Sequence, residues 1–92
     1  MIRSFRHRGL KRFYERGDRS GINPQHVDKI KRILALFDVA NSPEDMRLPS
    51  LRLHALRGDR AGYHAVVVRA NWRITFRFEH GDVYDVDLVD YH

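Results

Sequence analysis

A strict alternation of apolar and polar side chains near the carboxyl end of the chain constrains its fold most. Ile74, Phe76 and Phe78 alternate with polar residues from Arg73 to Glu79. A period of two predicts a β-strand with one buried and one polar face. Antiparallel sheets commonly bury one face and leave the other in water, so the segment predicts a sheet covered on one side.

Other segments are expected to complete this sheet. Leu51, Leu53 and Ala55 alternate with Arg52 and His54, and a valine-rich run follows. Ala70-Asn71 fits a two-residue hairpin, because Asn tolerates a positive φ. The segments predicted as strands are 2–5 (a first, edge-like strand), 51–55, 63–69, 73–79 and 83–88.

Two helices are predicted between the first strand and the rest. The first runs over about Arg8–Arg16, with Leu10 and Phe13 on its apolar stripe and Gly17 placed to end it. For the second, Asn23 and Pro24 read as an N-cap followed by proline in the first helical position. Apolar residues at spacings of three and four carry this helix to about Ala40.

The expected architecture is therefore an α+β fold in a single domain, residues 1–92. An amino-terminal strand and two antiparallel helices precede an antiparallel sheet of about four further strands. One sheet face packs on the helices, and the other is expected to be polar, open to solvent and available for chemistry.

Charge is distributed unevenly along the chain. Residues 1–37 carry ten basic and three acidic side chains, whereas residues 38–92 carry seven and nine, for a net charge of +5. A basic amino-terminal half on a small protein suggests a polyanion as partner, nucleic acid first and a membrane surface second. A merely solvated basic surface is the alternative.

Several classes of protein and of site are disfavoured. There is no cysteine, so disulfides and thiolate chemistry are excluded. The histidines show no close-spaced metal-ligand pattern, and a Gly-rich phosphate loop is absent, so neither a metal nor another cofactor is expected. No signal peptide or long apolar run is seen, so we expect a soluble, cytoplasmic protein without a membrane partner.

The reactive candidates suit metal-independent cleavage of RNA. This reaction needs a base for the 2′-hydroxyl, cations for the phosphorane and an acid for the leaving 5′-oxygen. His54, Arg73 and His92 satisfy these needs in kind, since histidine titrates near neutrality and arginine grips two phosphate oxygens. Each has another explanation: an exposed surface histidine, an arginine paired with Asp85 or Asp87, and a solvated carboxyl-terminal tail.

Several motifs follow one another along essentially the whole chain. They are Ile2-x-Ser4-Phe5-x-His7-x-Gly9-Leu10-Lys11, Ser42-Pro43-Glu44-Asp45-Met46, His54-x-Leu56-x-Gly58-Asp59, Gly62-Tyr63, Ala70-Asn71-Trp72-Arg73-Ile74-Thr75-Phe76-x-Phe78, Gly81-Asp82-x-Tyr84 and Asp90-Tyr91-His92. Together, and in this order, they resemble HigB toxins of the RelE/ParE superfamily.

The resemblance implies a microbial-ribonuclease-like (RelE-type) fold and a toxin of a type II toxin–antitoxin system. It implies a ribosome-dependent endoribonuclease that cuts messenger RNA in the A site and thereby inhibits translation. The implied partners are a HigA-type helix-turn-helix antitoxin, the ribosome and messenger RNA. Operator DNA is bound only indirectly, through the antitoxin.

The resemblance also implies a set of site residues. Those matching the family's catalytic positions are His54, Arg57, Arg73, Asp90, Tyr91 and His92. In our hypothesis His54 and His92 move protons, and Arg73 and Arg57 hold the phosphate. Asp90 orients a partner group or tunes it, while Tyr91 stacks on a base or assists proton transfer. The basic helix residues expected to contact RNA or the ribosome are Arg8, Lys11, Arg12, Lys29, Lys31 and Arg32.

Two departures from the family pattern bear on the site. Many relatives have lysine where this chain has Arg57, and arginine cannot give up a proton, which puts an acid role there in doubt. Relatives commonly have tryptophan where this chain has His64. That change either weakens packing or adds a further histidine near the site.

A second class of function stays open. ParE-type members of the same superfamily inhibit DNA gyrase without catalysis, on a similar fold. The set of His54, Arg73 and His92 favours the enzyme, because a gyrase inhibitor needs no proton-transfer pair. A simple nucleic-acid-binding module explains the charge but not the terminal tripeptide.

Overall fold

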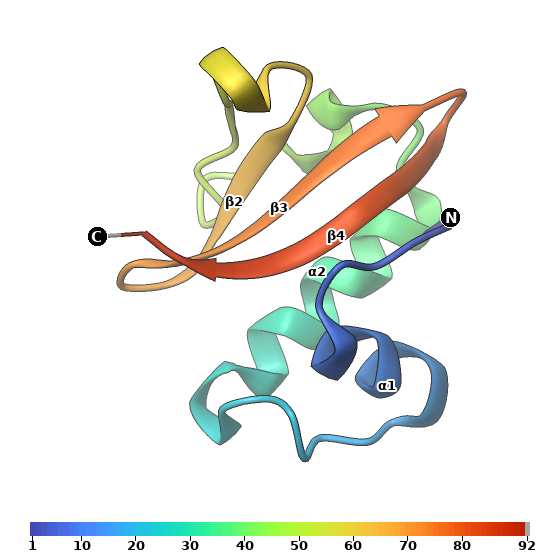
Figure 1. The fold of residues 1–92 in the computed structure, drawn as a ribbon, viewed down its shortest axis with the longest axis vertical. Coiled ribbons are helices and arrows are strands. Elements are labelled where there is room, and N and C mark those ends of the chain that lie inside the picture. The colour runs from blue at the N-terminus through green and yellow to red at the C-terminus, as the bar shows by residue number, and fades with distance from the viewer. Residues whose placement is uncertain (92) are drawn as a thin grey trace.

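A computed structural model describes residues 1–91 and confirms an α+β fold with two helices and a four-stranded antiparallel sheet (Figure 1). The strands lie in the order β1-β2-β3-β4, so each pairs with the next along the chain. The α-helices are α1 (Arg8–Arg16) and α2 (Val27–Val39), and the strands are β1 (His54–Ala55), β2 (His64–Arg69), β3 (Trp72–Glu79) and β4 (Asp82–Asp90). Three short 3-10 helices are η1 (Pro24–His26), η2 (Pro43–Met46) and η3 (Gly58–Arg60).

Helix α1 has the predicted bounds because both of its ends are capped. The Leu10 N–H donates a hydrogen bond to the His7 ring, which satisfies one free amide of the first turn. Gly17 adopts φ +69 at the other end, a left-handed conformation that glycine takes without steric cost. Leu10 and Phe13 are buried, so this short helix is held by its apolar stripe.

The second predicted helix begins with a tighter turn than expected. Asn23 accepts a hydrogen bond from the Gln25 N–H, as an N-cap does, but Pro24–His26 form a 3-10 turn before α2 starts at Val27. The buried residues of α2 follow the predicted spacing; they are Val27, Ile30, Ile33, Leu34 and Phe37. The Tyr14 hydroxyl of α1 donates to Asp38 of α2, and this bond raises the pKa of Tyr14 to about 12.

The core lies between the helices and one face of the sheet. Ile74 and Phe76 of β3 are fully buried, as their alternation predicted. The rings of Phe37 and Phe76 lie 4.7 Å apart and tilted by 60°, a favoured aromatic contact between α2 and the sheet. In Figure 1, α2 passes behind the sheet. This packing leaves the other face of β3, hereafter the outer face, to Arg73, Thr75 and Arg77.

The predicted strand 51–55 is wrong over most of its length. Only His54 and Ala55 form a ladder with β2, although the Leu51 carbonyl accepts the Val67 N–H at 2.7 Å, because Arg52 adopts φ +49 and interrupts the extended backbone. The hairpin between β2 and β3 forms as expected, but its positive φ falls on Ala70 (+50) rather than on Asn71. Strand β4 is longer than predicted at both ends and includes Asp90.

The amino-terminal segment lies at the edge of the sheet as predicted, but it forms two isolated bridges rather than a strand. Ile2 bridges Val83 and Phe5 bridges Val86, both in parallel fashion, without a continuous strand. Figure 1 shows this segment beside β4. It supplies partners for the backbone of β4, whose edge is thereby covered.

The prediction that the outer face is open to solvent is wrong at its centre. Thr75 and Ala65 point to this face but are fully buried. The segment that contains η3 folds back over them, and an Arg60 Nη2 donates to the Thr75 hydroxyl at 3.4 Å. The surface left for a ligand therefore lies toward the β2–β3 hairpin.

Within residues 1–91, no helix has both the length and the apolar character needed to cross a membrane.

Candidate functional site

Arg73 occupies the outer face at the hairpin end of the sheet. It alternates with buried Ile74 and lies opposite Val67 of β2 and Val89 of β4. Its Nη1 donates to the backbone carbonyls of Ala70 at 2.6 Å and Trp72 at 3.2 Å. These neutral acceptors hold one end of the fork and leave its charge for an anion.

The alternative that Arg73 pairs with Asp85 is not what the structure shows. Asp85 accepts hydrogen bonds from Arg77 Nε at 2.9 Å and from the Tyr63 hydroxyl at 2.8 Å. Asp87, the other acidic candidate, lies opposite Thr75, and one of its oxygens accepts the Leu88 N–H. Among residues 1–91, no carboxylate forms an ion pair with Arg73.

His54 lies on the neighbouring row of the sheet. It pairs with Ala65, whose other partner is Thr75, two residues beyond Arg73. With strands about 4.8 Å apart and a rise of about 3.3 Å per residue, the Cα atoms of His54 and Arg73 are about 12 Å apart. The His54 side chain is exposed, with Nδ1 3.4 Å from the Arg52 carbonyl oxygen. At this spacing, the side chains of His54 and Arg73 can both contact one phosphate that lies between them.

The carboxyl-terminal residues arrive at the same end of the sheet as Arg73. Asp90 lies opposite Trp72, and the Tyr91 N–H donates to the Asn71 carbonyl at 2.8 Å. Val89 lies opposite Arg73, and Asp90 is the next residue along β4. The strand register therefore puts Asp90 on the opposite face of the sheet from Arg73. Tyr91 is exposed. His92, the last predicted catalytic residue, lies outside the described residues.

Arg57 follows β1 at the end of that strand that points away from the β2–β3 hairpin. It is exposed and immediately precedes η3, so it belongs to the segment that folds over the outer face. The structure thus gathers Arg73, Asp90 and Tyr91 around the hairpin, sets His54 on the next row, and leaves Arg57 at the other side of His54.

A shallow depression of about 450 Å³ adjoins Arg73 where α2, the segment before β1 and the β2–β3 hairpin meet. Its charged lining residues are Lys29, Arg52, Arg69 and Arg73, and no acidic residue lines it. Partial burial, together with the neighbouring charges of Arg32 and Arg52, lowers the pKa of Lys29. The depression is therefore a region of unbalanced positive charge, as suits a polyanion.

The predicted RNA-contacting residues divide among three surfaces. Arg8, Lys11 and Arg12 line one side of α1, where Arg12 also pairs with Asp18 at 3.5 Å. Lys29 faces the depression, and Arg32 lies with it beside Ser50. Lys31 lies apart from these, in a groove with Tyr14.

Comparison with known proteins assigns the family. Residues 3–92 match the family model described as HigB-like toxin, a RelE-like toxin of the type II toxin–antitoxin system HigB. The chain belongs to the HigB-like toxin family. A curated relative, Endoribonuclease HigB from Proteus vulgaris, is 47% identical over 92 residues and covers the whole of both chains.

Solved structures confirm the fold of this HigB-like toxin. A mutant of YafQ from Escherichia coli is 16% identical, with a TM-score of 0.63 over 98% of this chain and 91% of its own. The YoeB dimer from Staphylococcus aureus is 15% identical, with a TM-score of 0.62 over 99% of this chain and 97% of its own. YoeB in the YoeB–YefM complex gives 0.64 at 16% identity, covering 100% and 98%. As a toxin of a type II system, the protein has an antitoxin as its partner.

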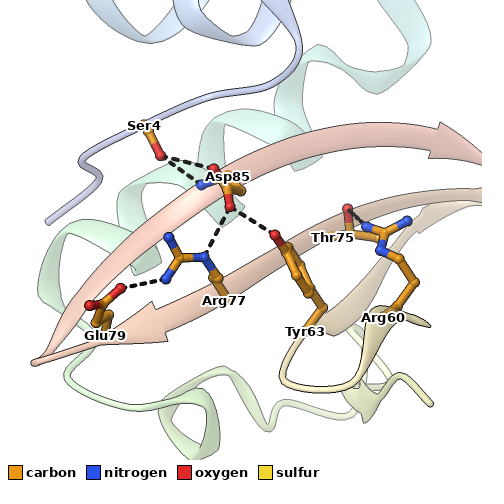
Figure 2. A network of polar contacts seen from close by, with 7 residues as sticks. All are labelled: Ser4, Arg60, Tyr63, Thr75, Arg77, Glu79 and Asp85. Atoms are coloured by element: carbon orange, nitrogen blue, oxygen red, sulfur yellow. Dashed lines mark hydrogen bonds and ion pairs between the residues drawn. The ribbon is translucent and has the colours of Figure 1, made fainter. Parts of the chain in front are cut away.

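A polar network in the HigB-like toxin fixes the loop that carries Arg57. Figure 2 shows Tyr63 and Arg77 pointing at Asp85, with Arg60 reaching Thr75. Asp85 sits at an irregularity in β4 with φ +57, and its own N–H donates to the Ser4 hydroxyl. Through Tyr63, Asp85 ties one end of the Arg57 loop to the sheet, so we regard Asp85 as a residue that positions this loop.

We expect Asp85→Asn to make the free energy of unfolding of the toxin less sensitive to a fall in pH. Hydrogen bonds from Arg77 and Tyr63 lower the pKa of Asp85 in the folded state, so its carboxylate stabilises the fold above the unfolded pKa of about 3.9. This contribution is lost as the pH falls through the lower, folded pKa. Urea unfolding midpoints should therefore differ between wild type and Asp85→Asn at pH 7 and converge toward pH 3.

A matched variant, Asp59→Asn, removes an exposed carboxylate from the loop that carries Arg57 and controls for the loss of one negative charge. A difference between wild type and Asp85→Asn that stays constant from pH 7 to pH 3 would contradict the predicted linkage.

The departure at His64 has a structural outcome. The His64 ring stacks on Phe76 with centroids 6.0 Å apart, so it retains an aromatic packing position. Burial lowers the pKa of His64, with opposing contributions from Glu44 and Arg47. His64 lies opposite Phe76 and thus toward the core, not on the outer face with Arg73. Packing, rather than proton transfer, is the role that this geometry supports.

Sequence reasoning missed two cations of the depression, Arg52 and Arg69. A signal for Arg52 was present, because it lies two residues before His54 on the polar side of the same alternation. Arg69 becomes relevant only when the hairpin places it opposite Trp72. Within residues 1–91, no group of three His, Asp or Glu side chains is placed so that it could hold a metal ion.

Proposed function

We propose that this HigB-like toxin is a ribosome-dependent endoribonuclease that cuts messenger RNA in the A site and so inhibits translation. The observation that carries the proposal is Arg73: an arginine without a carboxylate partner in residues 1–91, fixed by two backbone carbonyls beside a cationic depression. Endoribonuclease is also the activity in the name of the curated relative.

The proposed chemistry is general acid–base attack by the 2′-hydroxyl on the adjacent phosphate, without a metal. His54 and His92 transfer the protons, since imidazole titrates near neutral pH. Arg73 and Arg57 stabilise the charge that develops on the phosphorane. Asp90 orients a neighbouring group, and Tyr91 stacks on a base or assists proton transfer. The exposed position of His54 and Tyr91 is compatible with contact to a large substrate.

The proposed partners follow the same reasoning. The toxin is held inactive by a HigA-type helix-turn-helix antitoxin and meets operator DNA only through it. Free of the antitoxin, it acts in the cytoplasm on ribosomes that carry messenger RNA.

The test is primer extension on messenger RNA from ribosomes stalled at a defined codon, with and without purified toxin. Ends within the A-site codon that require both toxin and ribosomes would support the proposal. Intact messenger RNA with folded toxin would contradict it. A DNA supercoiling assay would then examine gyrase inhibition, the non-enzymatic alternative.

We expect Arg8→Gln/Lys11→Gln to weaken ribosome binding and flatten its salt dependence. Both residues are exposed on α1, away from Arg73, and each phosphate contact contributes about 0.7–0.9 to the slope of log affinity against log salt. Sedimentation with ribosomes at several salt concentrations measures the slope.

The control variant Arg3→Gln/Arg47→Gln removes the same net charge from two arginines that pair with Asp82 and Glu44. If the α1 variant keeps the wild-type slope, α1 does not dock on ribosomal RNA.

A further inference from the structure

Three cations besides Arg73 line the depression beside the hairpin, and each comes from a different part of the chain. Lys29 belongs to α2, Arg52 to the segment before β1, and Arg69 to the end of β2. Arg52 is exposed between buried Leu51 and Leu53, with φ +49. A non-glycine residue in this conformation costs free energy, and such positions are often found at functional sites.

Hydrogen bonds position two of these cations, Lys29 and Arg69, without neutralising them. Lys29 Nζ donates to the Ser50 carbonyl at 2.9 Å, and an Arg69 Nη1 donates to the Gln25 side-chain oxygen at 2.9 Å. Both acceptors are uncharged, as are the two carbonyls bound by Arg73. The positive charges therefore persist while the side chains are partly ordered, which lowers the entropic cost of binding an anion.

Some other arginines of the protein are instead paired with carboxylates. Arg3, Arg47 and Arg77 each contact a carboxylate at 2.9 Å or less. For Lys29, Arg52, Arg69 and Arg73 no ion pair with a carboxylate is found in the part of the chain that the structure describes. The depression thus brings together four cations without a carboxylate partner, although other described cations, such as Arg8 and Lys11 of α1, also lack one.

We infer that this depression binds the backbone phosphates of the substrate RNA strand next to the phosphate held by Arg73, through Lys29, Arg52 and Arg69. This inference rests on the proposed ribonuclease function and adds a substrate subsite to it. The depression has a volume of about 450 Å³ and is lined by these cations beside Arg73. Contacts to phosphates position a strand without reading its bases.

The test measures binding of a 2′-O-methyl RNA hexanucleotide, which lacks the attacking hydroxyl and cannot be cut by the proposed route. Fluorescence anisotropy across a range of salt concentrations gives the affinity and its salt slope. For Arg52→Gln/Arg69→Gln we expect at least about tenfold weaker binding at low salt, and a slope shallower by about 1.4, since each phosphate contact on a single strand contributes about 0.7.

Two further variants separate the subsite from charge and folding. Arg3→Gln/Arg47→Gln removes the same net charge from paired arginines and should keep most of the affinity and slope. Arg52→Lys/Arg69→Lys keeps both charges and should restore the slope if phosphate contact is the role of these residues. Thermal unfolding of every variant establishes that it is folded.

Three results would overturn the inference: no binding of the hexanucleotide by the wild type, an unchanged slope in Arg52→Gln/Arg69→Gln, or an equal loss in the control. If the double variant loses affinity for ribosomes but not for the hexanucleotide, the depression binds ribosomal RNA and the inference is also wrong.

Failure of the subsite is distinguishable from failure of the catalytic proposal, because hexanucleotide binding needs neither ribosome nor cleavage. Binding that depends on Arg52 and Arg69, with intact messenger RNA on ribosomes, would leave the subsite and remove the cleavage proposal. If the wild type cuts messenger RNA in the A site but hexanucleotide binding does not depend on Arg52 and Arg69, the cleavage proposal stands and the subsite is wrong.

Discussion

Arg73→Ala is expected to slow messenger RNA cleavage on the ribosome by about 100- to 1000-fold. Removal of one group that stabilises transition-state charge typically has an effect of this size. The backbone around Arg73 is held by the β2–β3 and β3–β4 ladders, and the side chain lies on the outer face, so the fold should remain intact. Time courses of primer extension at a single stalled codon measure the rate.

Arg73→Lys separates charge from geometry in the same assay. Lysine keeps a point charge but loses the planar fork, so we expect a rate between those of wild type and Arg73→Ala. Ribosome sedimentation should change little in either variant, because one cation contributes little to docking. A cleavage rate for Arg73→Ala within threefold of wild type would remove Arg73 from the proposed mechanism.

Phe76→Ala is expected to destabilise the fold by about 3–5 kcal/mol, the usual cost of truncating a buried phenylalanine. The Phe76 ring is fully buried and contacts Phe37, Phe78 and His64. A domain of this size has a total stability on the order of 5–10 kcal/mol, so much of it would be lost. Urea unfolding followed by circular dichroism gives the free energy.

Val39→Ala is the matched control for this measurement. Val39 ends α2 with 75% of its surface exposed, so its truncation should change the free energy of unfolding by less than about 0.5 kcal/mol. A comparable loss in both variants would mean that the Phe37–Phe76 contact is not central to the core.

The helices and the central strand were predictable because their patterns are local. Capping by Gly17 lies within a few residues of the helix that it ends, and the alternation of Ile74 and Phe76 reflects burial on a single strand. The strand 51–55 failed for a reason that the pattern does not carry. Alternation of Leu51 and Leu53 persists although φ +49 at Arg52 breaks the strand between them.

The site was predictable in its residue types more than in its arrangement. His54 and Arg73 were expected on polar strand faces, and the resemblance to the family supplied Arg57 and the terminal residues. The cover over Thr75 was not foreseen, since Arg60 reaches it across 15 residues of sequence, and Tyr63 reaches Asp85 across 22. Such contacts depend on the tertiary path of a loop that folds back over the sheet.

By itself, the sequence determined the two helices, the strands from residue 63 onward, which faces are apolar, and which family the motifs resemble. Only the tertiary structure decided which cations are neutralised. Strand register and the irregularity at Asp85 give this carboxylate to Arg77 and Tyr63, which leaves Arg73 with neutral carbonyls beside Lys29, Arg52 and Arg69. The strength of an ion pair depends on a distance of a few ångströms between charges that can come from distant segments. A local sequence pattern therefore specifies the charges but not their partners.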